Sequence, residues 1–592
     1  MCGIYGIIGK CKNIDKVAIN ALYELEYRGY DSSGIAFLNT NKEIKVIKST
    51  GKIENLEKNI NNHEVSTECL IAHTRWATHG KISTSNAHPH TSENVAIVHN
   101  GIITNYEELK NKLNSYKFYG ECDSEVIAKL MDYNLQRSKT ALEAFCKTIK
   151  ELKGSYAIEC IVKGEYNTIF IARKESPIYV CKYKDTVIAS SDLITFPKQT
   201  STYFEVSENQ ICELKKSKIK FFDLELNEIK GTSKKYDINE NKVSLNNYSH
   251  FMLKEIFDIP KALNDTMKKL ESSDKLNIDL SRFEKVHFIA CGTAYHSACV
   301  GAFMVQSLCG IDAQSHIASE WIDSPTLCNK NHLFVMISQS GETFDTILAL
   351  KKAKQNGCIC LSITNTSYST LANLSDYVLP IVAGKEVAVA STKVYNACNL
   401  ACLYLANKIK AERQNLELNL NDIKIDYNEI TKLLNAEFEK EFANTLINYK
   451  TIFFLGKCED YITAMEASLK LKEITYINSS AYPSGELKHG TLALVDNETL
   501  IIAYLTNANY TDKMISALSE VKARGGKVLL LSNQTLPKAL VDYSIKLSSG
   551  NSSINMLLYS IIPMQKLAYY TAIKLNKNPD KPRNLAKSVT VA

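Results

Sequence analysis

Cys2 lies so close to the start of the chain that removal of one residue would give it a catalytic α-amine. It follows only the initiator Met1, so removal of Met1 would leave Cys2 with both a thiol and a free α-amine. An α-amine has a reference pKa of about 7.7–8.0, so it can accept the thiol proton near neutral pH. The resulting thiolate is a strong nucleophile. For Cys2 alone, an incidental cysteine remains the simpler interpretation.

Polar residues further along the chain could bind the charged groups of a substrate that Cys2 attacks. Arg75 can bind a carboxylate through two parallel hydrogen bonds, and Asp123 can accept an α-ammonium group. The amide of Asn100 and the backbone N–H at Gly101 can stabilise an oxyanion. Half of the 12 histidines lie between positions 63 and 99, which makes a metal site an alternative. However, no His-Glu-x-x-His or Cys–His frame accompanies them.

A second candidate site follows an apolar run at residues 333–337. The polar sequence Ser-Gln-Ser-Gly-Glu-Thr at 338–343 comes next, and a helical pattern occupies 344–354. A polar loop between a strand and a helix N-terminus can bind an anion through hydroxyls, backbone N–H groups and the helix dipole. The loop lacks Gly-Lys-Ser/Thr, which argues against a nucleotide P-loop. For the loop in isolation, an ordinary Ser/Thr-rich helix cap is the simpler interpretation.

A third group of residues is charged and regularly spaced. Glu466, Lys470 and Glu473 are spaced i, i+4, i+7, so a helix places all three on one face. A carboxylate beside a lysine could move a proton and stabilise a developing oxyanion. A ladder of ion pairs on the protein surface is the alternative.

Three regions with different patterns must position these residues. The first, to about Asp223, mixes short β-like runs with one clear helix near 123–135, which predicts an α+β domain. The polar stretch at 227–247 resembles a linker. The second and third regions look like copies of each other: apolar strands near 288–292 and 359–363 recur near 453–457 and 528–531. Apolar strands that alternate with helices predict parallel sheets covered on both faces.

Composition narrows the class of protein. The chain has 592 residues, 45% hydrophobic and 23% charged, with a net charge of +6. That length corresponds to about three to four domains, and the weak, scattered positive charge does not favour nucleic-acid binding. No apolar run reaches 18 residues, so we expect no membrane span. The 17 cysteines follow no zinc or disulfide frame, which favours buried thiols in a reducing cytoplasm.

The first region resembles the glutaminase domain of the N-terminal-nucleophile amidotransferases. The resemblance rests on residues 1–4, 27–32, 73–78 and 99–102. It implies that Cys2 is the nucleophile, that Asn100 and Gly101 form the oxyanion hole, and that Trp76 gates the passage of ammonia. The residues implied around the substrate L-glutamine are Arg75, Trp76, Thr78, His79, His88 and Asp123.

The loop at 338–343 resembles the signature of sugar isomerase domains. Two such domains behind this glutaminase resemble the amidotransferase family that delivers ammonia to fructose-6-phosphate. The resemblance extends over essentially the whole chain through further motifs at 291–293, 389–393, 466–473, 485–490 and 582–591. The implied fold is an α+β N-terminal-nucleophile αββα sandwich followed by two α/β parallel-sheet sugar isomerase domains. We expect the glutaminase at 1–225, a linker at 226–247, sugar isomerase domains at 248–415 and 416–576, and a C-terminal tail closing the sugar site at 577–592.

The resemblance also implies roles in the sugar half. Glu473 is the base that moves a proton between C1 and C2, with Lys470 beside it. Lys587 is a Schiff-base lysine, and His489 opens the sugar ring across the interface of a homodimer. The residues implied around the phosphate are Thr293, Ser338, Gln339, Ser340 and Thr343, with Val389 and Ser391 near the sugar. We expect a cytoplasmic enzyme that makes glucosamine-6-phosphate and glutamate with no metal and no organic cofactor.

Two kinds of rival function remain to be weighed. Asparagine synthetase would need an ATP-cleaving Ser-Gly-Gly-x-Asp-Ser loop. The phosphoribosyl-transferring relative would need an acidic pair followed by Ser and Gly. The sequence contains neither motif. A non-catalytic sugar-phosphate sensor with a relic glutaminase belongs to another class. The joint presence of Cys2, Glu473, His489 and Lys587 argues against the sensor.

Overall fold

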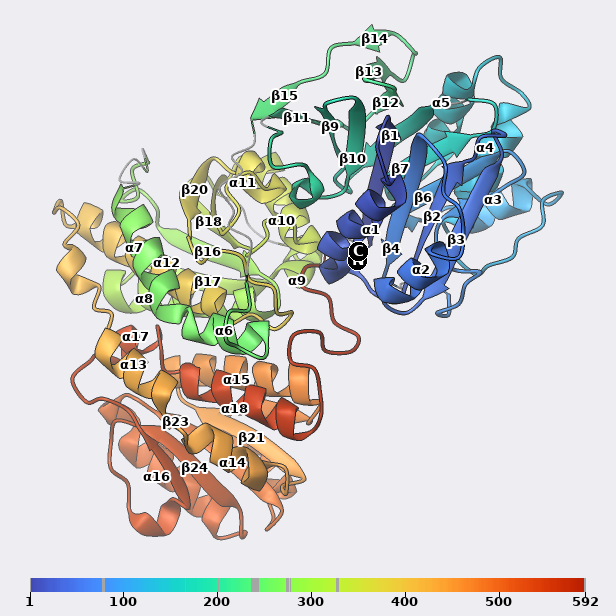
Figure 1. Ribbon diagram of the computed structural model, residues 1–592. Coiled ribbons are helices and arrows are strands. Elements are labelled where there is room, and N and C mark those ends of the chain that lie inside the picture. The colour runs from blue at the N-terminus through green and yellow to red at the C-terminus, as the bar shows by residue number, and fades with distance from the viewer. Residues whose placement is uncertain are drawn as a thin grey trace. The chain divides into compact units, whose positions relative to one another are not determined.

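The chain folds into two compact units. The computed structural model describes residues 2–76, 80–165, 167–200, 202–235, 244–272, 276, 278–325 and 329–589 (Figure 1). Unit 1 comprises Met1–Glu240 with Ser588–Ala592, and unit 2 comprises Asn241–Lys587. Among the described residues, no helix is both long enough and apolar enough to cross a membrane.

Unit 1 is built from two antiparallel sheets that pack face to face. One sheet has the order β15-β11-β9-β10-β1-β4-β2-β3 and the other β14-β13-β12-β8-β7-β6-β5. Helices α1 and α2 pack on the first sheet, and α4 and α5 on the second, which gives the αββα sandwich that the sequence predicts. The elements are β1 (Gly3–Gly9), α1 (Ile14–Leu25), β2 (Ser32–Leu38), β3 (Ile44–Thr50), α2 (Ile53–Ile60), β4 (Cys69–Arg75), β5 (His90–Thr91), β6 (Val95–Ile103), α3 (Tyr106–Lys112), α4 (Glu125–Leu135), α5 (Ala141–Glu151), β7 (Gly154–Val162), β8 (Thr168–Lys174), β9 (Tyr179–Tyr183), β10 (Thr186–Ser190), β11 (Thr202–Glu205), β12 (Gln210–Lys215), β13 (Lys218–Asp223), β14 (Glu228–Ile229) and β15 (Ser233–Lys235).

Strand β1 is buried along its whole length because both of its faces are covered. Alternate residues of a strand point to opposite faces. Ile4 and Ile8 accordingly join the core between the two sheets. Gly3 faces α1, where a Cβ atom would lie only 2.7 Å from Cβ of Leu25. The close packing of α1 against β1 fixes the strand that begins directly after Cys2.

The predicted linker at 226–247 differs from the structure in its first part. Residues Glu228–Ile229 form β14, which pairs with β13, and Ser233–Lys235 form β15, which pairs with β11. Both are short edge strands with largely exposed side chains. Their polar composition resembles that of a linker because an edge strand at the protein surface needs little apolar burial.

Unit 2 contains two parallel sheets of the same topology. The strand orders are β17-β16-β18-β19-β20 and β22-β21-β23-β24-β25, so each sheet places its first strand between its second and third. This repetition is the duplication that the sequence predicts. The elements of the first half are α6 (Phe251–Phe257), α7 (Ile259–Ser272), β16 (Lys285–Ala290), α8 (Gly292–Cys309), β17 (Asp312–Ile317), α9 (Ala318–Asp323), β18 (His332–Ile337), α10 (Phe344–Gln355), β19 (Ile359–Thr364), α11 (Thr370–Leu374), β20 (Tyr377–Pro380) and α12 (Lys393–Arg413).

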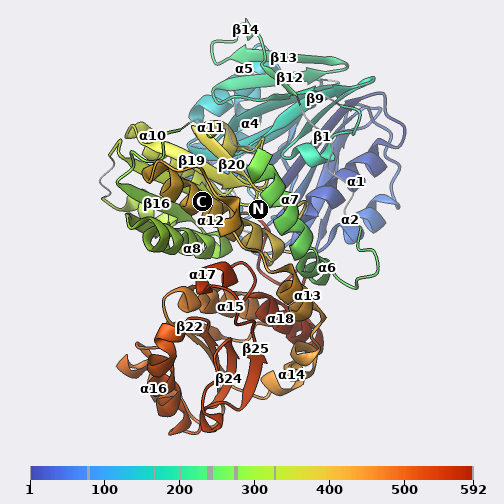
Figure 2. The same ribbon diagram turned by 90° about the vertical axis from the view of Figure 1, so that its left-hand side faces the viewer.

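The second half repeats the pattern and shares a core with the first. Its elements are α13 (Tyr427–Asn435), α14 (Phe438–Leu446), β21 (Thr451–Gly456), α15 (Glu459–Thr475), β22 (Ser479–Pro483), β23 (Thr499–Leu505), α16 (Thr511–Lys522), β24 (Lys527–Ser532), β25 (Tyr543–Lys546), α17 (Ser553–Met556) and α18 (Ile562–Lys574). Helices α15 and α18 pack together on one face of the second sheet, while α16 covers the other (Figures 1 and 2). Because α15 also contacts α8 of the first half, it is buried on nearly all sides.

Candidate active sites

The antiparallel pairing of β1 with β4 brings Cys2 to the end of β4. Gly3 lies opposite Thr74, so Cys2 lies beside Arg75 and Trp76. The backbone N–H of Trp76 donates to Sγ of Cys2 at 3.2 Å, and the thiol lies 3.6 Å from the Trp76 carbonyl oxygen. Burial raises the pKa of the Cys2 thiol, although the positive amino terminus partly offsets this effect. A base is therefore needed to form the thiolate.

Asn100 is held against the backbone of Cys2. Its side-chain Nδ2 donates to the Cys2 carbonyl oxygen at 2.9 Å, and its Oδ1 lies 3.2 Å from Nε2 of His73. The same Nε2 lies 3.0 Å from the carbonyl oxygen of His99, so we assign the imidazole proton to Nε2. Burial lowers the pKa of His73 to about 3, which keeps the ring neutral.

Gly101 follows Asn100 in β6 with a backbone conformation that suits glycine. Its φ angle is +134°, and a Cβ atom would lie 2.1 Å from the carbonyl oxygen of Ser155. Any side chain would push β6 away from β7. The glycine therefore keeps the backbone next to the Asn100 amide in its place.

Two more predicted glutamine ligands are buried near Cys2. Arg75 is only 2% exposed, and its positive charge lowers the pKa of Cys2. Asp123 is buried, accepts the backbone N–H of Ile103 at 2.8 Å and acts on the Cys2 pKa in the opposite direction. Thr78 and His79 lie outside the described residues.

His88 and Trp76 complete the predicted set in unit 1. The ring of His88 stacks on that of His73 with a centroid distance of 4.0 Å. Burial lowers the pKa of His88 well below its ordinary value. The ring of Trp76 meets that of Tyr30 edge to face at 5.8 Å.

The face of α15 that the spacing predicts carries a buried ion cluster rather than a surface ladder. Nζ of Lys470 lies 2.6 Å from Oε2 of Glu473 and 3.4 Å from Oε1 of Glu466. Lys470 and Glu466 are completely buried. Burial opposes the charge on Lys470, but the two carboxylates outweigh it and raise its pKa above the ordinary value. Lys470 is therefore a permanent cation near neutral pH.

Helix α8 of the first half contributes two side chains to this cluster. Thr293 accepts a hydrogen bond from Lys470 at 2.9 Å and donates to Oε1 of Glu466 at 3.1 Å. Nδ1 of His296 lies 2.7 Å from Oε2 of Glu466. Thr293, which the resemblance assigns to the phosphate, thus contacts the α15 cluster in the structure. His296 was not predicted at all.

The loop between β18 and α10 has the local geometry of an anion site. Oγ of Ser338 accepts the backbone N–H of Gly341 at 3.0 Å and lies 2.8 Å from Oγ1 of Thr343. Ser340 accepts the N–H of Glu342 at 3.1 Å. The carbonyl oxygen of Gln339 accepts the N–H of Asn365 at 3.2 Å, which ties the loop to β19. These hydroxyls lie at the N-terminus of the 12-residue helix α10.

Lys587 contacts a carboxylate that the sequence analysis missed. Its Nζ pairs with Oε2 of Glu386, and the same oxygen accepts from Oγ of Ser391 at 2.9 Å. The backbone N–H groups of Thr392 and Val394 bind the other oxygen of Glu386 at 2.9 and 3.1 Å. Burial opposes ionisation of Glu386, but Lys587 and these hydrogen bonds lower its pKa overall.

Three further features bear on the Lys587 site. Glu255 is buried beside it, where burial and the charge of Glu386 raise its pKa to about 8. The charge of Glu386 also raises the pKa of Lys470, which links the site to the α15 cluster. The backbone N–H of Val389 donates to the carbonyl oxygen of Asp580 at 3.0 Å, so the start of the tail runs along this segment.

His489 stands apart from these groups. It ends a short turn of helix after β22, and its side chain is exposed. Among the described residues, the hydrogen bonds and ion pairs of Lys470 and Lys587 do not involve it.

Comparisons with known proteins identify the family. Residues 73–197 match the glutamine amidotransferase domain, and residues 279–408 and 445–574 each match the SIS domain. A curated protein of Caldanaerobacter subterraneus subsp. tengcongensis, named glutamine–fructose-6-phosphate aminotransferase (isomerizing), is 39% identical over 612 residues, which cover 100% of both chains. The chain belongs to this aminotransferase family.

Two other relatives agree. The aminotransferase of the same name from Clostridium acetobutylicum is 37% identical over 613 residues, again across 100% of both chains. The solved C-terminal domain of glucosamine-fructose-6-phosphate aminotransferase from Francisella tularensis is 30% identical. It covers 58% of this chain and 100% of its own, with a TM-score of 0.53. The family resemblance and the fold class read from the motifs are therefore confirmed.

Proposed function

We propose that the chain hydrolyses L-glutamine with Cys2 and passes the ammonia to fructose-6-phosphate, forming glucosamine-6-phosphate and glutamate. This reaction starts the synthesis of amino sugars such as UDP-N-acetylglucosamine. The observation that carries the proposal is the match along the full length of the chain to aminotransferases of this name. The buried groups around Cys2 and around Lys470 give the two halves of the reaction plausible sites.

In the first half, the Cys2 thiolate attacks the side-chain amide carbon of glutamine. With Met1 removed, the α-amine of Cys2 accepts the thiol proton and later donates a proton to the departing ammonia. Asn100 and the N–H of Gly101 stabilise the oxyanion of the tetrahedral intermediate. Water then hydrolyses the thioester and releases glutamate.

Glutamine is recognised through its α-carboxylate and α-ammonium groups. The buried guanidinium of Arg75 binds the carboxylate, and Asp123 binds the ammonium. The family resemblance also assigns Thr78, His79 and His88 to glutamine, and Trp76 gates the departing ammonia. Removal of these charged groups from water strengthens their interaction with a ligand of complementary charge.

In the second half, the sugar phosphate binds at the carboxyl edge of the first parallel sheet of unit 2. The hydroxyls of Ser338, Ser340 and Thr343, with Gln339 and the N-terminus of α10, hold the phosphate. Thr293 belongs to the same proposed phosphate set, and its hydroxyl also accepts a hydrogen bond from Lys470 of the α15 cluster. Val389 and Ser391 line the sugar.

Lys587 and Glu473 perform the chemistry on the open-chain sugar. Lys587 passes a proton to Glu386 and attacks the C2 ketone, and water leaves as the Schiff base forms. Ammonia then replaces the lysine on C2. Glu473 carries a proton from C1 to C2, while the permanent charge of Lys470 stabilises the enolate-like oxygen.

His489 opens the sugar ring in this scheme and is supplied by a second copy of the chain. The exposure of His489, away from the groups of its own chain, supports this part of the proposal. We therefore propose a homodimer, which acts in the cytoplasm. Mixing a His489→Ala chain with a Glu473→Gln chain tests it: shared sites restore activity in the mixed dimer. Activity no higher than that of the separate variants would contradict it.

The test of the proposed function compares the native chain with Cys2→Ala in buffer that contains a chelator. The native chain should form glucosamine-6-phosphate from fructose-6-phosphate with either glutamine or ammonia, and the variant should do so only with ammonia. Glutamate release stimulated by another sugar phosphate would change the acceptor. A native chain that releases no glutamate under any condition would favour a sugar-phosphate sensor.

A further inference from the structure

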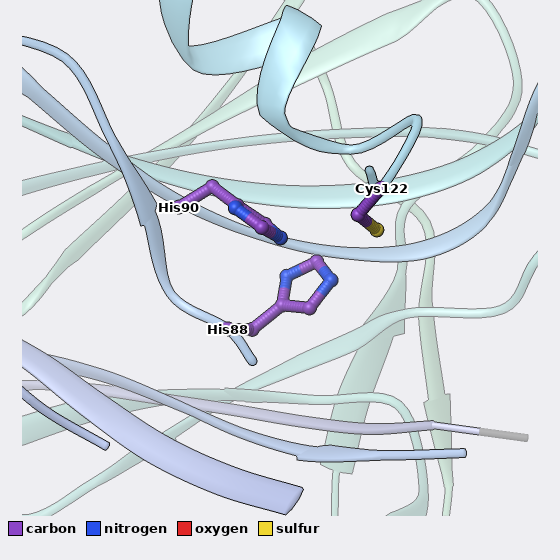
Figure 3. Close-up of side chains that lie close together, drawn as sticks. All are labelled: His88, His90 and Cys122. Atoms are coloured by element: carbon purple, nitrogen blue, oxygen red, sulfur yellow. The ribbon is translucent and has the colours of Figure 1, made fainter. Parts of the chain in front are cut away.

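Three side chains of metal-ligating types converge in unit 1, and one of them, His88, also belongs to the proposed glutamine pocket. His88 precedes β5, His90 begins it, and Cys122 lies in the loop before α4. One ligand atom from each residue lies within 4.8 Å of the other two. Figure 3 shows the two imidazole rings and the thiol pointing toward one another. The three ligands therefore come from two separate segments of the chain.

Each of the two histidines has one ring nitrogen that no described residue binds. Both side chains are 2% exposed. Nδ1 of His88 and Nε2 of His90 have no hydrogen-bond partner among the described residues. A buried polar atom without a partner destabilises the folded chain and calls for an explanation. The thiol of Cys122 can donate to Oγ of Ser124 at 3.4 Å or to Oδ1 of Asp123 at 3.5 Å, and a metal ion would replace this weak hydrogen bond.

We propose that His88, His90 and Cys122 bind one divalent transition-metal ion of the zinc class. Neutral imidazole and thiolate are the ligands that zinc prefers, and three protein ligands leave the fourth tetrahedral position open. The thiol proton passes to bulk water as the sulfur–metal bond forms. The site then carries one net positive charge in place of two unsatisfied nitrogens.

No known spacing frame in the sequence marks this metal site. His88 and His90 are only two positions apart, but strand β6 and helix α3 lie between them and Cys122. The fold brings the cysteine to the pair. Only the structure could therefore indicate this set of ligands.

The metal site has a consequence that rests on the proposed function. Cys122 adjoins Asp123, which we propose binds the α-ammonium group of glutamine, and His88 belongs to the same proposed pocket. A bound cation places positive charge beside Asp123 and holds His88 in the metal site. We therefore expect the metal to inhibit the use of glutamine and to spare the use of ammonia.

Cobalt binding tests the site without any need for activity. The full chain carrying Cys2→Ala, which removes the N-terminal aminothiol, is titrated with Co²⁺ and followed by the thiolate-to-cobalt charge-transfer band. We expect one equivalent to bind with that band. Adding Cys122→Ser should abolish the band and weaken binding by about 100-fold or more, since even loss of an outer partner costs 10–100-fold. His90→Gln should weaken binding by a similar factor.

A matched control uses another half-buried cysteine of unit 1. Cys11→Ser in the same background should leave the band and the affinity unchanged, because Cys11 lies outside the cluster. A band that survives Cys122→Ser, or no band in the parent chain, would overturn the proposed site.

An activity measurement separates the inhibitory effect from the site itself. In the chain with native Cys2, Zn²⁺ should block product formation from glutamine but not from ammonia. Cys122→Ser should raise the half-inhibitory Zn²⁺ concentration at least about 10-fold. An unchanged value would refute the inhibition while the cobalt result still decides the site. Absence of glutamine-dependent product before any metal is added would instead count against the proposed function.

Discussion

Lys470 and Lys587 are both buried beside carboxylates, but their surroundings suit different tasks. Lys470 lies between two carboxylates, which raise its pKa despite its burial. Such a lysine stays charged and cannot act as a nucleophile. Lys587 pairs with a single carboxylate, Glu386, which is itself fixed by Ser391 and two backbone N–H groups. Proton transfer to this fixed acceptor would leave Lys587 neutral and able to attack a ketone.

The Glu386→Gln variant tests whether Lys587 is the nucleophile and Glu386 its proton acceptor. It removes the proton acceptor of Lys587, so product formation from ammonia should fall at least about 100-fold, which is the usual contribution of a general base. Borohydride trapping of fructose-6-phosphate on Lys587, followed by mass spectrometry, should fall with it. Glutamine hydrolysis at Cys2 should persist. The control is Glu429→Gln, another buried glutamate of unit 2 with different partners. Native-level trapping in Glu386→Gln would contradict the assignment.

For individual residues, the sequence can predict which side chains lie together only where they share a local pattern. The spacing of Glu466, Lys470 and Glu473 on one helix face was enough to bring them together. Glu386 lies just before the motif at 389–393, but its partner Lys587 is 201 positions away, so the sequence does not pair the two. Only tertiary packing brings the two together. His296 was missed for the same reason, since its partner Glu466 lies on α15.

Among the structural elements, three neighbouring strands of unit 2 carry a row of histidines. In the order β17-β16-β18, Nδ1 of His287 lies 2.9 Å from Nε2 of His316, and its Nε2 lies 3.2 Å from Nδ1 of His332. Burial, together with the two neighbouring imidazoles, lowers the pKa of His287 to about 3. A neutral ring can donate to one neighbour and accept from the other, but a protonated ring cannot accept.

This row should make unit 2 sensitive to acid. Between pH 6.5 and about 3 the unfolded chain binds a proton at position 287 that the folded chain does not, so stability falls as the pH falls below 6.5. The loss should reach about 2 kcal/mol per group at pH 5. In His287→Phe the difference in unfolding free energy between pH 7 and pH 5 should shrink by about that amount.

Urea unfolding followed by tryptophan fluorescence provides the measurement. The chain has two tryptophans, and Trp321 is buried in unit 2 with its ring 5.6 Å from that of Phe334. In a Trp76→Phe background the signal therefore reports unit 2. Exposed His63, in unit 1, serves as the control through His63→Gln. An equal pH dependence in His287→Phe and its parent would show that the row does not cause the acid sensitivity.

The elements themselves were predictable where burial leaves a clear pattern. The apolar runs at β16, β18, β21 and β24 predict strands covered on both faces, and the structure has them in two parallel sheets. Edge strands β14 and β15 left no such signal because their side chains stay largely exposed. Their assignment depends on the backbone pairing with β13 and β11, which composition does not record.

At the scale of the whole molecule, the two units hold the two halves of one proposed reaction. Ammonia released into neutral water is mostly protonated and no longer nucleophilic. A closed passage that excludes water would keep it reactive. The proposed gate is Trp76, whose backbone binds Sγ of Cys2. Trp76 would then act on the transfer of ammonia rather than on its release.

The Trp76→Ala variant tests the gate. Glutamine hydrolysis should continue, because Cys2 binds the backbone rather than the side chain of Trp76. Formation of glucosamine-6-phosphate per glutamate released should fall well below one. Trp76→Phe, which retains an aromatic ring beside Tyr30, should preserve more of the coupling. Equal loss of both activities in Trp76→Ala would refute the gating role.

The most direct test of the central claim follows the nitrogen atom from glutamine to the sugar. The native chain is supplied with fructose-6-phosphate, amide-¹⁵N glutamine and an excess of unlabelled ammonium, and the isotope content of the product is measured by mass spectrometry. Delivery of ammonia within the enzyme predicts glucosamine-6-phosphate whose ¹⁵N content far exceeds the share of ¹⁵N in the free ammonium pool. Product labelled only in proportion to the ammonium pool, or no amino sugar at all, would contradict it.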